Sequence, residues 1–215
     1  MGLVRVVGVL LALVVVTGVA TVLAAGLKGQ LAGVQLGRDP ARVRALIVDP
    51  ARHAAMRRGL WVDFAFLASY WLAFVALAIL LAHRGTWGYV LGAAAALAAS
   101  LTALLDVTEN VRTFGVLARN RAGDVLAVPQ LEELRRVSLG KWAASALTVA
   151  LLSATFVHHS RVLWIAIALL VLAAVGLAGL AWNLLLRLFI LGLAVAGGFL
   201  AVLFLGWPET IVRGL

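Results

Sequence analysis

The sequence contains no cysteine in its 215 residues. Disulfide bonds, thiolate nucleophiles and sites in which cysteine holds zinc or an iron–sulfur cluster are therefore excluded. Without cysteine, the chain also carries no compositional sign of an oxidising or a reducing compartment.

Charged residues are scarce as well. They make up 13% of the chain, against 64% hydrophobic residues, and the mean hydropathy is +1.09. A soluble domain is closer to half apolar and about a quarter charged. A chain of this size could not hide so much apolar surface from water, so we expect lipid to surround it.

The common catalytic motifs are missing too. The chain has no G-x-S-x-G, no H-E-x-x-H and no G-x-x-x-x-G-K-[ST] sequence, and no span carries a ladder of arginines. The segment "DVTEN" has only two acids, too few for an Asp-rich motif that binds metal and diphosphate. The sequence therefore specifies no cofactor and no metal site.

What the chain has in abundance is long apolar runs, each near the ~20 residues that cross a bilayer as a helix. Alanine and leucine dominate them and nothing alternates with period two, which argues against transmembrane strands. We therefore predict one polytopic domain over residues 1–215, an all-α integral membrane protein built as a six-helix bundle. The predicted spans cover about residues 4–26, 62–82, 88–110, 142–158, 162–180 and 184–206.

Two of these spans need comment. The first could be a signal peptide, with "LAAG" as a cleavage-like end, but Val6 to Leu27 is long enough to span, and we expect a retained helix. The fifth and sixth are interrupted only by "GLAGLAWN". As one helix they would be more than twice as long as the ~30 Å hydrocarbon core, so we expect a turn there.

The basic residues predict the orientation. Fourteen of the 18 Lys and Arg fall in the loops 27–61 and 111–141 or in the last turn, all on one side of the predicted bundle. By the positive-inside rule, these loops are cytoplasmic and both termini are outside. The fourteen are Lys28, Arg38, Arg42, Arg44, Arg52, Arg57, Arg58, Arg112, Arg119, Arg121, Arg135, Arg136, Lys141 and Arg187; the other four are Arg5, Arg84, Arg161 and Arg213.

This distribution also bears on location and partners. We expect a multi-pass protein of the cell membrane, and the excess of Arg over Lys with much Ala, Val and Leu favours a bacterial inner membrane. Topology already accounts for the net charge of +9, so we expect anionic lipid at the cytoplasmic loops and no nucleic acid. An oligomer or a larger membrane complex is compatible with the composition.

Tryptophan supports the predicted spans. Six of the seven tryptophans fall at predicted span ends, as interfacial aromatic belts require. These six are Trp61, Trp87, Trp142, Trp164, Trp182 and Trp207, whereas Trp71 falls inside a span.

The loops contain short helical patterns. In 27–61, Asp39-Pro40 and Asp49-Pro50 each predict the start of a short helix. The first carries an apolar stripe of Val43, Leu46 and Ile47, which suits either a helix on the inner leaflet or a connector packed on the bundle. In 111–141 we expect a turn near Gly123, a short helix from about Pro129 and a surface pair of Glu132 with Arg136.

A polar stripe runs along one face of the third span. Its steps of four, three, one and three residues keep all its members on one side of a helix. Ionisable groups inside a membrane are expensive, so the stripe must face the interior or the interface. It comprises Thr102, Asp106, Glu109, Asn110 and Thr113.

The predicted topology brings other polar groups to the same depth. Asp63 near the start of the second span and Lys141 near the start of the fourth lie on the cytoplasmic side with Asp106 and Glu109, and Tyr70 follows Asp63 on its face. Three carboxyls then meet one ammonium. We expect Arg112, Arg135 or Arg136, a proton, or a bound cation to supply the missing positive charge.

Three functions remain open for this cluster. It could bind or translocate a small ion or a lipid-like ligand through Asp63, Tyr70, Asp106, Glu109, Asn110 and Lys141, which is the function we favour. It could be the site of a membrane enzyme that uses an Asp or Glu as general acid–base on a lipid or isoprenoid substrate. The chain could also be a non-catalytic subunit, with the cluster as structural ion pairs and interhelical hydrogen bonds.

The histidines give a weaker signal. His83, His158 and His159 lie at outer span ends beside arginines, which oppose a bound cation, so we expect no metal site there. His53, in the first loop, is expected at the interface.

Overall fold

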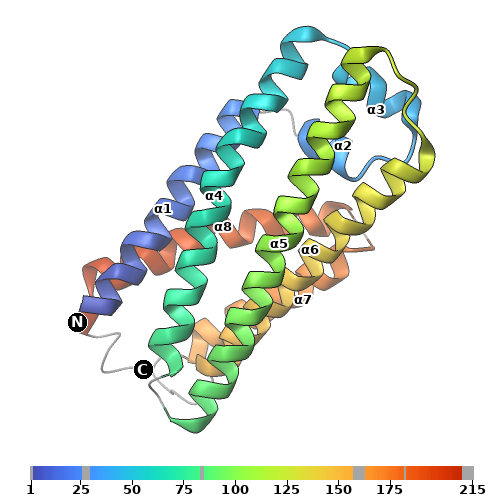
Figure 1. The fold of residues 1–215 in the computed structure, drawn as a ribbon. Coiled ribbons are helices and arrows are strands. Elements are labelled where there is room, and N and C mark those ends of the chain that lie inside the picture. Colours follow the sequence, from blue (N-terminus) through green and yellow to red (C-terminus); the bar gives the residue numbers. More distant parts are fainter. Residues whose placement is uncertain (1, 26–29, 83–84, 157–162, 182, 210–215) are drawn as a thin grey trace. The chain divides into compact units, whose positions relative to one another are not determined.

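The computed structural model describes residues 2–25, 30–82, 85–156, 163–181 and 183–209, and within them all regular elements are α-helices (Figure 1). They follow one another along the chain as α1 (Gly2–Ala25), α2 (Gln30–Gln35), α3 (Pro40–Ile47), α4 (Pro50–Ala82), α5 (Thr86–Ala122), α6 (Val128–Phe156), α7 (Leu163–Gly179) and α8 (Asn183–Gly206).

Five of these helices are long and apolar enough to cross a membrane: α1, α4, α5, α6 and α8. Helix α7 is apolar throughout but has only 17 residues, fewer than the ~20 that usually span a bilayer. The chain is therefore an all-helical protein with five candidate membrane-spanning helices. The count of six spans and the outward position of both termini remain predictions.

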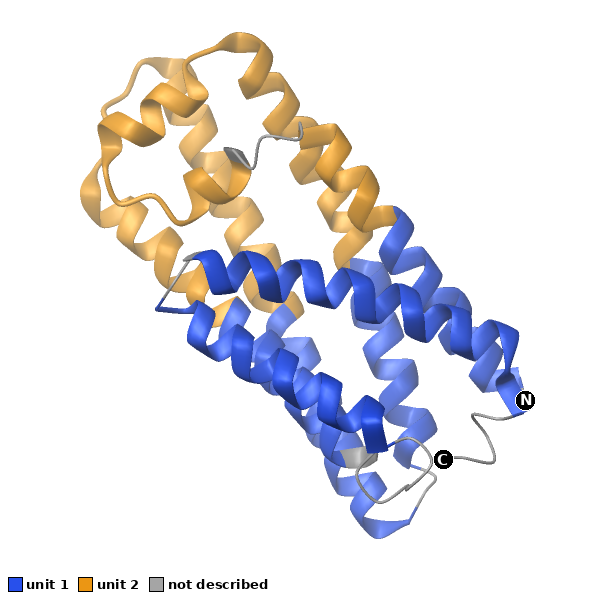
Figure 2. Ribbon diagram, turned by 180° about the vertical axis from the view of Figure 1, so that it is seen from behind, with its two compact units in different colours: residues 1–16, 68–102, 142–215 blue, residues 17–67, 103–141 orange. Residues whose placement is uncertain are grey.

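The chain divides into two compact units, coloured separately in Figure 2. Unit 1 comprises Met1–Val16, Ala68–Thr102 and Trp142–Leu215, and unit 2 comprises Thr17–Leu67 and Ala103–Lys141. Helices α1, α4, α5 and α6 contribute residues to both units.

The core of unit 1 is mainly apolar. Buried Val, Leu, Ile, Ala and Phe side chains from α1, α4, α5, α6, α7 and α8 form one continuous cluster. Small residues let the last two helices approach closely: a Cβ atom on Gly179 of α7 would lie 2.6 Å from the backbone nitrogen of Leu186 on α8. This pair of helices fits the predicted turn between the last two apolar stretches.

Unit 2 has its own core. Side chains from the short helices pack on the polar ends of the long ones, and the buried members are Val34, Val43, Ile47, Met56, Leu60, Val116, Leu117, Leu126, Leu131 and Leu134. Val43 and Ile47 are each 1% exposed. The apolar stripe of α3 therefore faces protein, which decides for the packed connector over a helix lying on the lipid leaflet.

Helix caps confirm part of the loop prediction and correct the rest. The Asp39 carboxylate accepts from the Ala41 amide at 2.9 Å and starts α3, and Asp49 does the same for Ala51 at 2.8 Å. The prediction of a separate short helix after Asp49 was wrong, because α4 continues without a break to Ala82. Hydropathy shows where the apolar part of the sequence begins, but the helix itself starts earlier, in the polar part, and continues through that boundary.

The second loop needs the same correction. The turn near Gly123 is confirmed, with a φ of 83° that glycine adopts without strain. The helix expected near Pro129 is the first part of α6, which begins at Val128 and ends at Phe156. The Glu132–Arg136 pair is present at 3.9 Å.

Tryptophan exposure agrees with a lipid-facing or interfacial position. Trp61, Trp87, Trp164 and Trp207 are between 52% and 69% exposed, a large apolar surface that water alone would disfavour. Trp182 lies outside the described residues.

Candidate functional site

The centre of the candidate site is one face of α5 in unit 2. Asp106 is 4% exposed, Glu109 1%, and Asn110 and Thr113 0%. Each follows another by one helical turn or a single step, so the helix alone aligns them. Thr102, the first member of the predicted stripe, is also buried but belongs to unit 1, where its hydroxyl donates to the Ala98 carbonyl of its own helix.

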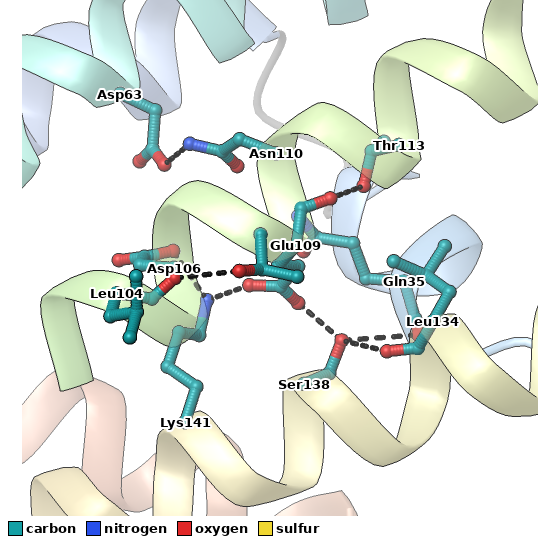
Figure 3. Close-up of polar contacts among 11 residues, drawn as sticks. Gln35, Asp63, Leu104, Asp106, Glu109, Asn110, Thr113, Leu134, Ser138 and Lys141 are labelled. Carbon is teal, nitrogen blue, oxygen red and sulfur yellow. Dashed lines mark hydrogen bonds and ion pairs between the residues drawn. The ribbon is translucent and has the colours of Figure 1, made fainter. Parts of the chain in front are cut away.

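Lys141 of α6 links two of these carboxylates. Its Nζ lies 3.0 Å from Asp106 Oδ1 and also donates to Glu109 Oε2 (Figure 3). The residue is 8% exposed, so this ion pair is screened little by water. The ammonium thus bridges two acids that stand one turn apart on α5.

Ser138 holds the other oxygen of Glu109. It lies three residues before Lys141 on α6 and is fully buried. Its Oγ contacts Glu109 Oε1, and two carbonyl oxygens are also in reach, that of Leu134 at 3.1 Å and that of Gln35 at 3.3 Å (Figure 3). A hydroxyl has one proton to donate, so these three oxygens compete for it.

Asp63 of α4 joins the cluster through Asn110. The amide nitrogen of Asn110 donates to Asp63 Oδ2 at 2.7 Å, which ties α4 to α5 (Figure 3). The amide oxygen of the same residue is buried and has no hydrogen-bond partner among the described residues. Unsatisfied buried oxygens are uncommon and ask for an explanation.

Among the described residues, the cluster joins more acids than bases. Asp63, Asp106 and Glu109 are three acids in unit 2, and Lys141 is the base whose ion pairs with Asp106 and Glu109 are seen. Two of the arginines that we expected as partners are engaged elsewhere. Arg112 lies 2.6 Å from the Glu133 carboxylate, and Arg136 pairs with Glu132 one turn earlier on α6.

The structure thus brings together five of the six predicted site residues: Asp63, Asp106, Glu109, Asn110 and Lys141. The sixth, Tyr70, belongs to unit 1, where its ring lies 6.1 Å from that of Phe74. Its place in the site remains a prediction, as does the ligand-binding role of the whole set.

The histidine predictions are only partly addressed. His83, His158 and His159 lie outside the described residues. His53 on α4 is within 3.0 Å of the Leu117 carbonyl of α5, through its Nε2 atom. Among the residues that the structure describes, no three of His, Asp and Glu come together in a way that could hold a metal ion.

Sequence reasoning missed two members of the cluster. Ser138 was visible as part of a polar stripe with Lys141, but serine alone is weak evidence because it commonly bonds the preceding turn. The Gln35 carbonyl comes from α2, a six-residue helix without a distinctive pattern. Every residue has a backbone carbonyl, so the sequence gives no sign of which one will accept a hydrogen bond.

Comparison with known proteins gives no further guide: no protein family, no curated protein and no solved structure matches this chain.

Proposed function

We propose that this membrane protein binds a small cation, the proton, at the acidic cluster of unit 2, and that this is the ion-binding step of its function. The observation that carries the proposal is the position of Glu109. It is 1% exposed and held between the Lys141 ammonium and the Ser138 hydroxyl, in a cluster with more acid than base.

Ser138 supports two protonation states of Glu109. When Glu109 is ionised, the serine hydroxyl donates to Oε1. When Glu109 carries a proton, its own O–H can donate to Ser138 Oγ, and the serine proton turns to the Leu134 carbonyl at 3.1 Å. Both arrangements keep the hydrogen bond between Glu109 Oε1 and Ser138 Oγ, so Glu109 can gain or lose a proton without losing that contact.

Asn110 can form a hydrogen bond with Asp63 in either protonation state of that carboxyl. Its NH₂ group suits an ionised Asp63, which accepts at 2.7 Å. Rotation of the amide by half a turn would present Oδ1, the atom that has no partner, to a protonated Asp63 as an acceptor. The unsatisfied oxygen therefore has a use in the second protonation state.

Lys141 partly compensates the negative charge of the three carboxyls. A fixed ammonium between Asp106 and Glu109 stabilises part of the negative charge, and a bound proton neutralises more of what remains. A lipid substrate would need to reach the carboxyls, and exposures of 4% for Asp106 and 1% for Glu109 disfavour the membrane-enzyme alternative.

Infrared difference spectroscopy tests the proposal. The purified protein, in lipid, is taken through a pH series while the carbonyl stretch of protonated carboxylic acids is recorded. We expect a buried band, slow to respond to D₂O, that changes with pH and is lost in Glu109→Gln. Glu132→Gln is the matched control, because that carboxyl is on α6 with its side chain 55% exposed, and it should leave the buried band unchanged.

Two outcomes would count against proton binding. If no buried carboxyl band responds over the pH range in which the protein stays folded, the cluster is structural glue. If Glu132→Gln removes the same band as Glu109→Gln, the signal comes from the surface. Proton uptake into liposomes containing the protein then separates translocation from binding alone, since Glu109→Gln should abolish uptake only if the site lies on a conducting path.

A further inference from the structure

Helix α4 changes character sharply near its first third. Its beginning carries Arg52, Arg57 and Arg58, whereas the part after Trp61 is mainly apolar and its one charged residue is Asp63, which bonds to α5. Arg57 and Arg58 are exposed, and Trp61 is 65% exposed. Arg57, Arg58 and Trp61 therefore lie within five residues of one another, where the charged part of the helix gives way to the apolar part.

Helical spacing places Arg57, Trp61 and Phe64 along one stripe, with steps of four and three residues. The Trp61 ring lies 5.8 Å from that of Phe64 and 5.5 Å from that of Phe114 on α5. Phe114 is partly buried against the core of unit 2. The indole is thus held by rings on two helices and yet most of its surface is open.

Arg57 and Arg58 differ from Arg42 and Arg52 in their ion pairs. Arg42 on α3 and Arg52 on α4 each have an aspartate three residues earlier, at 3.5 Å and 3.4 Å. Among the described residues, Arg57 and Arg58 have no carboxylate partner. These two guanidinium groups are therefore available to an external anion, whereas those of Arg42 and Arg52 already contact aspartates.

We propose that Arg57, Arg58 and Trp61 form a binding site for the headgroup of an anionic phospholipid. The two guanidinium groups bind the phosphate, with the geometry that arginine offers to such oxygens. Trp61 lies at the level of the headgroup, as tryptophan does at membrane interfaces. Phe64 and the apolar continuation of α4 lie along the acyl chain.

The apolar part of the stripe is what selects a lipid as the occupant. A free phosphate or a soluble phosphorylated molecule would use the arginines but gain nothing from Trp61 and Phe64. A phospholipid uses both ends of the stripe at once. The proposal is independent of proton binding, since neither arginine is joined to the Glu109 cluster by any contact among the described residues.

Native mass spectrometry of the detergent-extracted full chain provides the test. The protein is mixed with phosphatidylglycerol or with phosphatidylcholine of the same acyl chains, and retained lipid is counted. We expect phosphatidylglycerol to be retained over phosphatidylcholine, and Arg57→Gln or Arg58→Gln to weaken its binding about fivefold each. Trp61→Ala should weaken the retention of both lipids.

Arg52→Gln is the matched control. It removes the same charge from the same helix, but five residues before Arg57 and therefore on a different face. We expect it to change phosphatidylglycerol binding by less than about twofold. All these arginines are exposed, so loss of folding is not expected, and intrinsic fluorescence of the variants confirms that they remain folded.

Three results would overturn the proposal. Equal retention of the two lipids would show that the headgroup charge is not recognised. An equal loss in Arg52→Gln would show that only net charge matters. Full competition by soluble glycerol phosphate at the concentration of the lipid would show that the arginines bind a free anion and that the apolar stripe contributes nothing.

Discussion

The side-chain amide of Asn110 on α5 donates to the Asp63 carboxylate on α4 over 2.7 Å, between residues that are 47 positions apart. Asn110 has no exposed surface. A hydrogen bond from a buried amide to a partly buried carboxylate is stronger than one at the surface, and losing it removes a donor from Asp63.

Replacing Asn110 by leucine tests this contact. The substitution keeps the size of the side chain and removes the donor to Asp63, so we expect the free energy of unfolding to fall by about 2 kcal/mol. The seven tryptophans provide the fluorescence signal for thermal unfolding in detergent. Thr108→Val is the control, because the Thr108 hydroxyl bonds only the Leu104 carbonyl of its own helix; a similar loss in both variants would contradict the special role of Asn110.

Lys141→Met should be the most destabilising change in the cluster. It leaves Asp106 and Glu109 buried without their ammonium, which costs about 3–5 kcal/mol. Adding Glu109→Gln to Lys141→Met removes one of the stranded charges, and we expect the double variant to recover part of the stability that the single variant lost. Unfolding by denaturant, followed through tryptophan fluorescence, measures both variants.

The surface pair of Arg136 with Glu132 provides the comparison for Lys141. Its side chains are 78% and 55% exposed, and Arg136→Gln should cost less than about 1 kcal/mol. If Lys141→Met is as mild as Arg136→Gln, the cluster is open to solvent and its ion pairs are not buried.

A glycine in α4 permits a close approach of α1. A Cβ atom on Gly59 would lie 3.0 Å from Cα and 3.2 Å from the nitrogen of Ala25, and neither backbone atom can move alone. We expect Gly59→Val to destabilise unit 2 by about 1–3 kcal/mol. Gly115→Ala meets nothing within 4 Å and should be neutral or stabilising, by up to about 1 kcal/mol. Thermal unfolding that ranks the two variants in the opposite order would contradict this packing.

Much of the cluster was predictable, because charged and amide residues are conspicuous in an apolar run and helical spacing shows which of them share a face. Asp106, Glu109 and Asn110 stand out in an apolar run, and antiparallel helices bring Asp63 and Lys141 to the same end. The structure joins these residues through α4–α5 and α5–α6 contacts. What the sequence could not reveal was how they are satisfied, because Ser138 is a common residue and Gln35 contributes only its carbonyl.

Helix boundaries were the weakest part of the prediction. Hydropathy responds to the surroundings of a side chain, whereas a helix is maintained by backbone hydrogen bonds that continue from lipid into polar surroundings. Helix α5 therefore continues past the predicted end at 110 to Ala122, and α6 begins at Val128 rather than 142. Only caps such as Asp39 and turns such as Gly123 mark true ends, and those were predicted correctly.

The orientation of the chain remains a prediction, and the absence of cysteine makes it straightforward to test. A single cysteine at Asp124, in the turn between α5 and α6, should be protected from a membrane-impermeant maleimide in intact cells. A cysteine at Thr86, at the start of α5, should be labelled, because the positive-inside rule puts the two ends of α5 on opposite sides. Both positions are exposed, so labelling after permeabilisation controls for reactivity. The reverse pattern would invert the topology and place the acidic cluster of unit 2 on the outer side of the membrane.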